Sequence, residues 1–268
     1  MFSAKVVSGD SKIIDIKGGE ASNVVCKKVN AKLPLNSFDE EKFKAYLDEH
    51  KIGYKMEKTD VIDITVFGVA AHASMPDLGV NAISHLLEAL YAAGFEDHFV
   101  DWFHKHFALS VHGELLGFEK IADKVSNTSI NFGVIYKKEN DVCMSLDMRF
   151  PVMSDTKTVA GLMKIDDEHT HLEVGGMVEP LYFDVNTPMI KALKKAYEDV
   201  TGDHESQMEA IGGGTYAKAI SNCIAFGCEF SGEDNHIHDA NEKLDLESFK
   251  KQVAIYIEAI KNLNEIED

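Results

Sequence analysis

The sequence predicts a mixed α/β protein built of two parts. Two observations carry this prediction: strand patterns of period two alternate with amphipathic helix patterns along the chain, and the pattern changes near residue 182. A length of 268 residues allows one large domain or two ordinary domains with real cores. The hydrophobic content of 45% and the charged content of 27% are those of a folded globular protein.

Four elements are predicted before residue 110: a helix over 37–50, a strand over 60–67, a helix over 83–91 that ends at Gly94, and a helix over 95–107. The first helix follows Ser37-Phe38-Asp39-Glu40, which fits a capping box. The strand places Ile62, Ile64 and Val66 on one face. Both later helices carry apolar residues at helical spacing, so each is expected to cover a core.

Residues 128–150 predict a β-hairpin, in which "TSINFGVIYK" and "VCMSLDMRF" flank the turn "KEND". Strict alternation in the second arm assigns one set of side chains to the core: Val142, Met144, Leu146, Met148 and Phe150. The opposite face then carries Cys143, Ser145, Asp147 and Arg149. Another strand-like run, "HLEVGGMVEPLYF", closes this region near residue 183.

The second part begins after this run, with a boundary near residue 182 that separates 1–182 from 183–268. Thr187-Pro188 predicts an N-cap and a first-turn proline, and Gly202 ends the helix that follows. A short strand, a glycine loop, the run "NCIAFG" and a long final helix are expected to complete this part.

The charge balance limits the classes of partner that the protein is expected to bind. The chain has 45 acidic and 27 basic residues and a net charge of −18, so phosphate backbones and anionic lipids repel it. Nucleic acid and membranes are therefore not expected as partners. The N-terminus lacks the pattern of a signal peptide, and no apolar run reaches the roughly 18–20 residues that span a bilayer. Four cysteines without a Cys-x-x-Cys pair indicate buried thiols in a reducing compartment, and we expect a cytoplasmic protein.

The stretch "SGEDNHIHDANEKL", residues 231–244, has the composition of a metal site. His236 and His238 would point the same way in an extended segment and could share one metal ion. The alternative is a pair of solvated histidines in an acidic surface turn. The spacing alone favours that alternative, because His-x-His lacks a third ligand nearby.

A glycine loop lies in "EAIGGGTYAKAI", residues 209–220. Glycines allow close approach to the backbone, and free N–H groups at a helix start favour an anion such as a carboxylate. The spacing of a phosphate-binding loop is absent. Taken by itself, the loop is better explained as a tight strand-to-helix turn.

Two further side chains suit substrate binding. His72 lies among small residues in "GVAAHASMPDLGVNA", which leaves room for its imidazole to donate to a substrate oxyanion. The alternative is a histidine satisfied by loop carbonyls. Arg149 is the only arginine in the chain, and its guanidinium suits bidentate binding of a carboxylate. Equally, it could pair with Asp147 or another acidic neighbour.

In this order, "GVAAHASMPDLGVNA", "LDMRFPV", "GGGTYA", and "AFG" with "HDANE" resemble the second half of a dinuclear-zinc peptidase of the aminoacylase and carboxypeptidase type. The nearest branch is similar to the V-type dipeptidases of lactic acid bacteria and, more distantly, to carnosinases. The resemblance covers the chain from about Ile13 onward.

The resemblance implies a fold in which residues 1–182 form a double ferredoxin-like α/β lid. Residues 183–268 would then be the C-terminal portion of an α/β zinc-peptidase catalytic domain. Such a double lid is found in monomeric members of this branch, so the full-length protein is expected to be a monomer.

The same resemblance implies roles for seven residues of this chain. His72 matches the lid histidine that steadies the tetrahedral intermediate, and His238 matches the last zinc ligand. The groups that match those around the substrate's C-terminal carboxylate are Asn23 in "GGEASNVV", Arg149, Gly213, Gly214 and Thr215.

One departure from the family pattern is large. The family's first half carries a His-x-Asp ligand, a bridging aspartate, a Glu-Glu pair and a further acidic ligand, and none of these motifs is found here. Dinuclear hydrolysis needs about four to six ligands around two ions roughly 3.5–4 Å apart and a base for the bridging water. One histidine cannot supply them, so the chain alone is expected to be inactive.

The resemblance therefore implies a parent protein that hydrolyses short peptides with a free C-terminal carboxylate. It would use two zinc ions, or manganese or cobalt, and a missing N-terminal catalytic half. Two alternatives remain. One is a related N-acyl amino acid amidohydrolase or carboxypeptidase, and the other is a non-catalytic binding protein derived from the lid.

Overall fold

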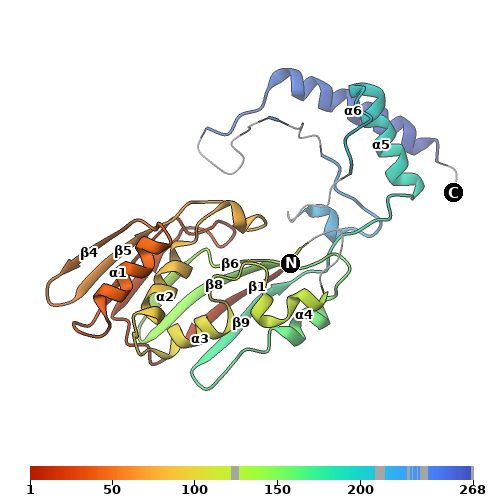
Figure 1. Ribbon diagram of the computed structural model, residues 1–268. Coiled ribbons are helices and arrows are strands. Elements are labelled where there is room, and N and C mark those ends of the chain that lie inside the picture. The colour runs from red at the N-terminus through yellow and green to blue at the C-terminus, as the bar shows by residue number, and fades with distance from the viewer. Residues whose placement is uncertain are drawn as a thin grey trace. The chain divides into compact units, whose positions relative to one another are not determined.

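The strands of the first part form a nine-stranded sheet in which the neighbouring strands are antiparallel (Figure 1). The computed structural model describes residues 1–121, 127–208, 215–227, 230, 232–233, 235 and 241–266. The chain divides into two units, Met1–Pro180 and the described residues from Leu181 onward. Within the described residues, no helix is long and apolar enough to cross a membrane.

The strand order is β4-β5-β3-β2-β7-β8-β1-β9, and β6 also pairs with β8. The strands are β1 (Phe2–Ser8), β2 (Asp15–Gly18), β3 (Lys28–Leu33), β4 (Tyr54–Lys58), β5 (Ile62–Phe67), β6 (Ser129–Asn131), β7 (Ile135–Lys138), β8 (Asp141–Arg149) and β9 (Thr170–Met177). The N-terminal strand β1 lies between β8 and β9, so strands that are far apart in the sequence are neighbours in the sheet.

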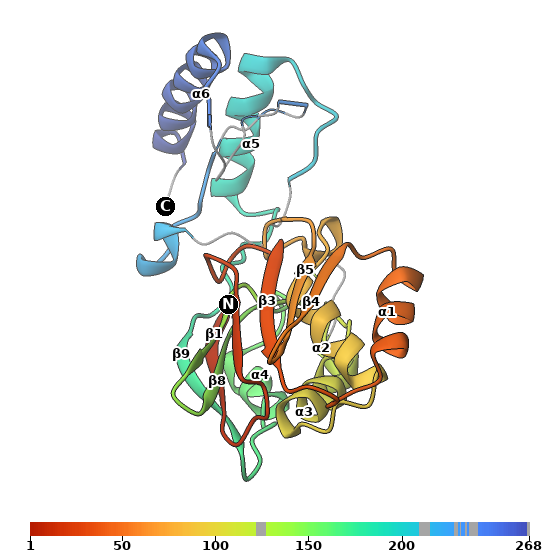
Figure 2. The same cartoon turned by 90° about the vertical axis from the view of Figure 1, so that its left-hand side faces the viewer.

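The helices are α1 (Glu40–Glu49), α2 (Ala82–Ala92), α3 (His98–His106) and α4 (Thr156–Leu162) in the first unit, and α5 (Pro188–Thr201) and α6 (Leu246–Asn264) in the second. Four short 3-10 turns complete the described elements: η1 (Pro76–Leu78), η2 (Glu114–Leu116), η3 (Phe118–Ile121) and η4 (Tyr216–Ala219). One core cluster joins apolar residues of α1 to α4 with one set of strand side chains, so these helices cover one face of the sheet (Figure 2).

Several predicted elements are confirmed. Ile62, Ile64 and Val66 are fully buried on β5. The left-handed Gly94 follows the end of α2, and Gly202 ends α5 in the same conformation. The predicted core face of β8 lies in the main cluster.

One expectation was wrong in detail. Asp39, not Ser37, caps α1, because its carboxylate accepts from Glu41 N and Lys42 N at 3.1 Å, whereas the Ser37 hydroxyl donates to Pro34 O. The short strand expected directly before the glycine loop falls on residues that lie outside the described ones.

The hairpin is confirmed, but its first arm is interrupted. Ser129–Asn131 and Ile135–Lys138 both pair with β8, and the register changes between them. Val134 N donates to the Ser145 hydroxyl and Ser145 N donates to Val134 O, which keeps the interruption joined to β8. Gly133 lies within it.

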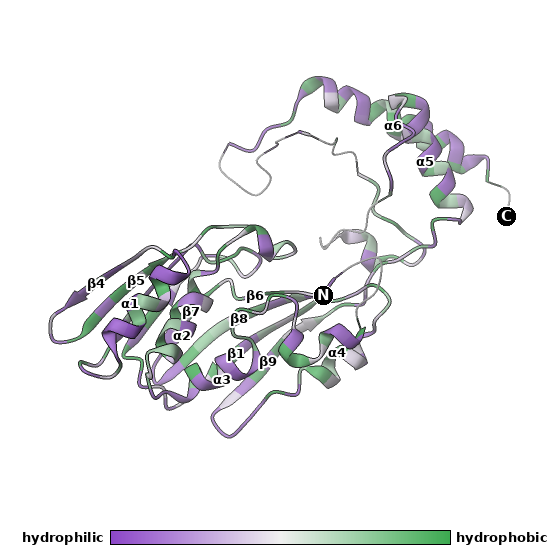
Figure 3. Ribbon diagram, in the orientation of Figure 1, coloured by the Kyte–Doolittle hydropathy of each residue, from purple (hydrophilic) through white to green (hydrophobic). Residues whose placement is uncertain are grey.

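The second unit has a small core and a large exposed apolar surface. Leu193, Ala196 and Ala259 form its buried cluster between α5 and α6. Figure 3 shows apolar and polar residues alternating along α6. Six apolar side chains of this helix are 42–70% exposed: Leu246, Phe249, Val253, Tyr256, Ile257 and Ile260. A stripe with this i, i+3, i+4 spacing normally packs on another element.

We predict that His85 makes the first unit less stable in mild acid. Burial between α1 and α2, with a smaller effect of His50, lowers the pKa of His85 from 6.5 to about 4. Between these values the unfolded chain binds a proton that the folded unit does not. Stability is therefore lost as pH falls from 6.5 towards 4, by at most about 3 kcal/mol.

The measurement is urea unfolding of the first unit at several pH values, followed by the near-UV signal of Trp102. In His85→Gln the free energy of unfolding should depend less steeply on pH between 6.5 and 4. In His171→Gln, at a side chain that is 54% exposed, its pH dependence should stay as in the wild type. Equal slopes in the wild-type chain and in His85→Gln would contradict the prediction.

Candidate functional site

Asn23 and His72 lie side by side in the first unit. Val24 and His72 form an antiparallel bridge. On either side of it, Ala73 N donates to Asn23 O at 2.9 Å and Val25 N donates to Ala71 O at 2.8 Å. This short ladder joins two loops that are about 50 residues apart in sequence.

The side chain of Asn131 holds the Asn23 loop against the sheet. Asn131 is 1% exposed, and its amide donates to Ser22 O at 2.8 Å and to Val24 O at 3.1 Å. Its carbonyl oxygen accepts from the amide of Asn81 at 3.3 Å. One buried side chain therefore satisfies two carbonyls of the loop, and a buried carbonyl without a donor would cost about 1–3 kcal/mol.

The interrupted arm of the hairpin brings the sheet close enough for these bonds. A Cβ on Gly133 would lie 2.3 Å from Ala21 O and 2.5 Å from Ser22 O. Only glycine can occupy this position without moving the loop. The break between β6 and β7 therefore makes room for the Asn23 loop.

The hydrogen bonds of His72 define its neutral tautomer. The backbone N–H of Ser74, which can only donate, lies 3.2 Å from His72 Nδ1, and the Ser74 hydroxyl lies 2.7 Å from the same nitrogen. Nδ1 therefore acts as an acceptor, and the proton of the neutral ring is on Nε2. A ring in this form has the N–H donor that an oxyanion requires.

Arg149 pairs with Asp147 in the structure, which is the alternative that its sequence position left open. Its Nε donates to one carboxylate oxygen at 2.7 Å and its terminal nitrogen donates to the other at 3.2 Å. The two side chains are only 12% and 7% exposed. The pair fixes the orientation of the guanidinium at the end of β8.

The register of the sheet relates Arg149 to the Asn23 loop. Asn131 is the cross-strand partner of Asp147, and Ser129 is the partner of Arg149. Direct cross-strand partners lie about 5 Å apart, and residues two positions apart on a strand about 7 Å apart. Asn131 thus links the backbone of the Asn23–His72 ladder to the strand that carries Arg149, and these three residues are called the group around Asn131.

The remaining site residues belong to the second part of the chain. Thr215 is half-buried, and its hydroxyl caps η4 by accepting from Ala217 N at 3.2 Å. Gly213, Gly214 and His238 lie outside the described residues, as does His236.

The described residues do not fit a metal centre. Within them, no three His, Cys, Asp or Glu side chains are grouped so as to hold an ion. A dinuclear zinc site needs several such donors around each ion. Thus the described part of this chain contains no set of metal ligands.

The cysteines are free where they are described. Cys26 and Cys143 are buried, and Cys223 is half-buried. Burial raises the pKa of the Cys26 thiol, which makes it a poor nucleophile.

Asn131 and Ser74 were not predicted as site residues from the sequence. Asn131 sits in "TSINFG", where an amide on the polar face of a strand gives no sign of what it binds. Ser74 follows His72 by two residues, a spacing at which a hydroxyl can reach the imidazole, and this signal was available.

The chain is similar in sequence to a known peptidase family. The model of peptidase family M20/M25/M40 matches residues 14–262. A protein of Staphylococcus haemolyticus and one of Staphylococcus aureus, both named "putative dipeptidase", are each 29% identical to this chain over 264 residues. The match covers 95% of this chain, which spans about 56% of the length of these relatives.

We predict that Asn131→Leu loosens the Asn23 loop. Ser22 O and Val24 O would lose their buried donor, which should lower the free energy of unfolding by about 1–3 kcal/mol and speed amide exchange at Val24, Val25 and Ala73. Asn30→Leu is the matched control, because Asn30 donates to Ile64 O far from this loop. Equal exchange in the two variants at these three amides would show that Asn131 does not hold the loop.

Proposed function

Because the chain belongs to peptidase family M20/M25/M40, we propose that its parent protein is a metal-dependent dipeptidase. The substrate would be a short peptide with a free C-terminal carboxylate. The names of the two staphylococcal relatives support this choice within the family.

The observation that carries the proposal is the set of contacts through which Asn131 joins the Asn23–His72 ladder to the strand pair that carries Arg149. An amide, a neutral imidazole with its proton on Nε2 and a guanidinium are donors suited to carboxylate and carbonyl oxygens. Arg149 is held by Asp147 in a fixed orientation, so less entropy would be lost when a carboxylate binds.

Each of these residues has a separate role in the proposal. Arg149 and Asn23 hold the substrate's free carboxylate, with Gly213, Gly214 and Thr215 beside it. The Nε2–H of His72 donates to the oxygen of the scissile carbonyl as negative charge develops there. A longer substrate would place no carboxylate at this position, which selects short peptides.

The metal ions of the proposal are held mainly by residues outside this chain. Two zinc ions, or manganese or cobalt, would activate the attacking water, and His238 would be one ligand. The relatives are nearly twice as long as this chain, which agrees with a catalytic half encoded elsewhere. The described residues supply binding and orientation only.

The two parts of the chain take different roles. In the proposal residues 1–182 form a double ferredoxin-like lid, and residues 183–268 form the C-terminal portion of the catalytic domain. The exposed apolar stripe of α6 supports this division, because it is the kind of surface that packs on a larger domain. The lid of a monomeric enzyme would need no second copy.

We predict that the purified chain does not hydrolyse dipeptides when zinc or manganese is supplied. The missing ligands and base leave no way to activate water. The assay is release of amino acids from alanyl-alanine by the chain and by its His238→Ala variant. Turnover that persists through purification to homogeneity and disappears in His238→Ala would refute the proposal that the catalytic half is missing from this chain.

In the full-length protein, we predict that Arg149→Met lowers kcat/KM for alanyl-alanine by about 10- to 100-fold, because one charged hydrogen-bonding partner of the carboxylate is lost. The same variant should change kcat/KM for alanyl-alanine amide little. Asp147→Asn is the control, since it retains an acceptor for Arg149 and the guanidinium charge.

An equal loss with the dipeptide and its amide would mean that Arg149 is structural and not a carboxylate clamp. N-acetyl amino acids, tested beside the dipeptide, distinguish the amidohydrolase alternative. Their preferred hydrolysis would assign the protein to that class.

A further inference from the structure

The second half of the edge strand β9 has backbone groups without a strand partner beside an apolar pocket. From these two features we propose that this edge binds a short extended peptide as an added strand, with one bulky apolar side chain in the pocket. The site is separate from the grouping around Asn131, and the inference does not depend on the proposed function.

In the first half of β9, the backbone amides that point away from β1 already have hydrogen-bond acceptors. Thr170 N donates to the Asp167 carboxylate at 2.8 Å, and Leu172 N donates to the Asp166 carboxylate at 3.0 Å. Both amides therefore point away from β1. Carboxylates that take up edge amides in this way prevent pairing with another strand.

The second half is open. Amides two positions apart on a strand point to the same side, so Val174 N points outward like Leu172 N. Gly175 is the extra residue of a bulge, because Ser3 pairs with Gly176 and Ala4 with Val174. Val178 N donates back to Met1 O at 2.8 Å, so Met177 N points outward as well. Val174 is 57% exposed, and no acceptor for either amide is found among the described residues.

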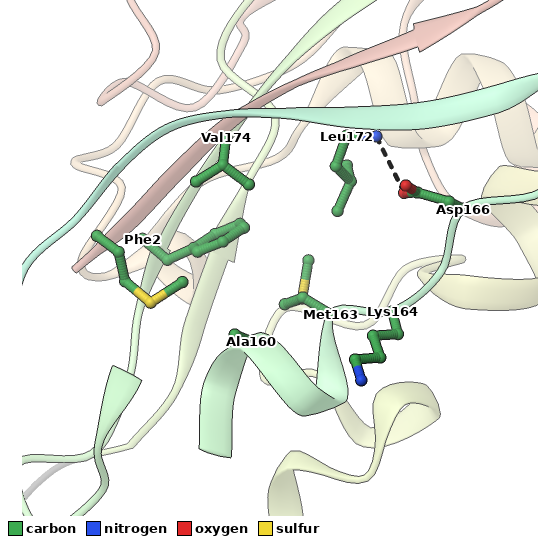
Figure 4. A pocket seen from close by; sticks show the side chains of 8 residues that line it. Phe2, Ala160, Met163, Lys164, Asp166, Leu172 and Val174 are labelled. Carbon is green, nitrogen blue, oxygen red and sulfur yellow. Dashed lines mark hydrogen bonds between the residues drawn. The ribbon is translucent and has the colours of Figure 1, made fainter. Parts of the chain in front are cut away.

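The pocket lies directly beside this open segment. It has a volume of about 310 Å³, and α4, β1 and β9 line it with Phe2, Ala160, Met163, Leu172, Val174 and Met177. Figure 4 shows Phe2, Met163, Leu172 and Val174 arranged around the pocket, with Lys164 next to Met163 and Asp166 bonded to the backbone of Leu172. These are the walls of a site for an aliphatic or aromatic side chain.

The edge and the pocket are in register with each other. Leu172 and Val174, whose amides point outward, also turn their side chains to the helix-covered face, where the pocket lies. A residue paired with Val174 in an added antiparallel strand would place its own side chain on that face. Main-chain hydrogen bonds and one side-chain pocket are the two components of recognition by strand addition.

A second copy of this chain does not fit the edge. Two β9 strands could pair only through their four open residues, because Asp166 and Asp167 close the preceding amides, and a contact of this size is far below the roughly 1,000 Å² that a stable dimer buries. The open segment runs only from Val174 to Met177. A peptide of about four residues matches this length, whereas a dipeptide is too short to use both outward amides.

The test is an NMR titration of the whole chain with the capped peptide acetyl-Lys-Thr-Leu-Thr-Lys-amide, which has no free carboxylate. The amides of Val174 and Met177 should shift saturably. A peptide with N-methyl leucine should bind about tenfold more weakly because one main-chain hydrogen bond is lost. A peptide with alanine in place of leucine should bind about tenfold or more weakly because the pocket stays empty.

Two protein variants complete the test. Val174→Pro deletes the outward N–H without touching the ladder with β1 and should abolish binding, whereas Val174→Thr keeps the N–H and the shape and should bind as the wild type does. Ala160→Phe, at an exposed position of α4, fills the pocket and should weaken binding at least tenfold. The circular dichroism of each variant should match that of the wild type.

Absence of saturable shifts at Val174 and Met177 would overturn the proposal. Equal affinity of the parent, N-methyl and alanine peptides would overturn it too. Sedimentation that shows a dimer of this chain, dissolved by Val174→Pro and unaffected by the peptide, would assign the edge to a second copy and overturn it as well.

Discussion

The buried amide of Asn131 is the interaction on which the candidate site depends. Two carbonyl groups of the Asn23 loop have their donor in this side chain, and the loop in turn forms the ladder that places His72. The same residue is the cross-strand partner of Asp147, which fixes Arg149. A cost of about 1–3 kcal/mol for each unsatisfied buried group keeps these three segments together.

Periodicity predicted the parts of the fold that a single segment determines. The alternation of Ile62, Ile64 and Val66 and the face of β8 follow from local pattern, because a one-residue slip would expose the whole set. The order of the strands does not follow from local pattern. β1 lies between β8 and β9, and pairings more than 130 residues apart leave no periodic signal.

The candidate site, like the fold, was only partly predictable from the sequence. His72 and Arg149 stood out in the sequence by residue type and setting, but the bidentate pairing of Arg149 with Asp147 was only one of two possibilities. Asn131 gave no signal at all, because its importance lies in the carbonyls that Gly133 allows to approach it. The resemblance to a family, and not the spacing of residues, brought Asn23 into the set.

The two units differ in how much of their apolar surface and how many of their backbone amides are covered by their own residues. The first unit has a continuous core beneath four helices and uses Asp166 and Asp167 to close half of its edge strand. The second has only a small cluster between α5 and α6 and leaves one side of α6 apolar and exposed. This contrast supports the proposal that the first unit is a lid and that the second packs on further sequence of a catalytic domain.

The most direct measurement is a side-chain NMR titration of this chain with alanyl-alanine and with alanyl-alanine amide. Resonances of the Asn23 amide, the His72 ring and the Arg149 Nε are followed at neutral pH. Recognition of a carboxylate by the group around Asn131 predicts saturable shifts of all three with the free dipeptide and much smaller shifts with its amide. Identical responses to the two ligands, or shifts confined to residues away from this group, would contradict it.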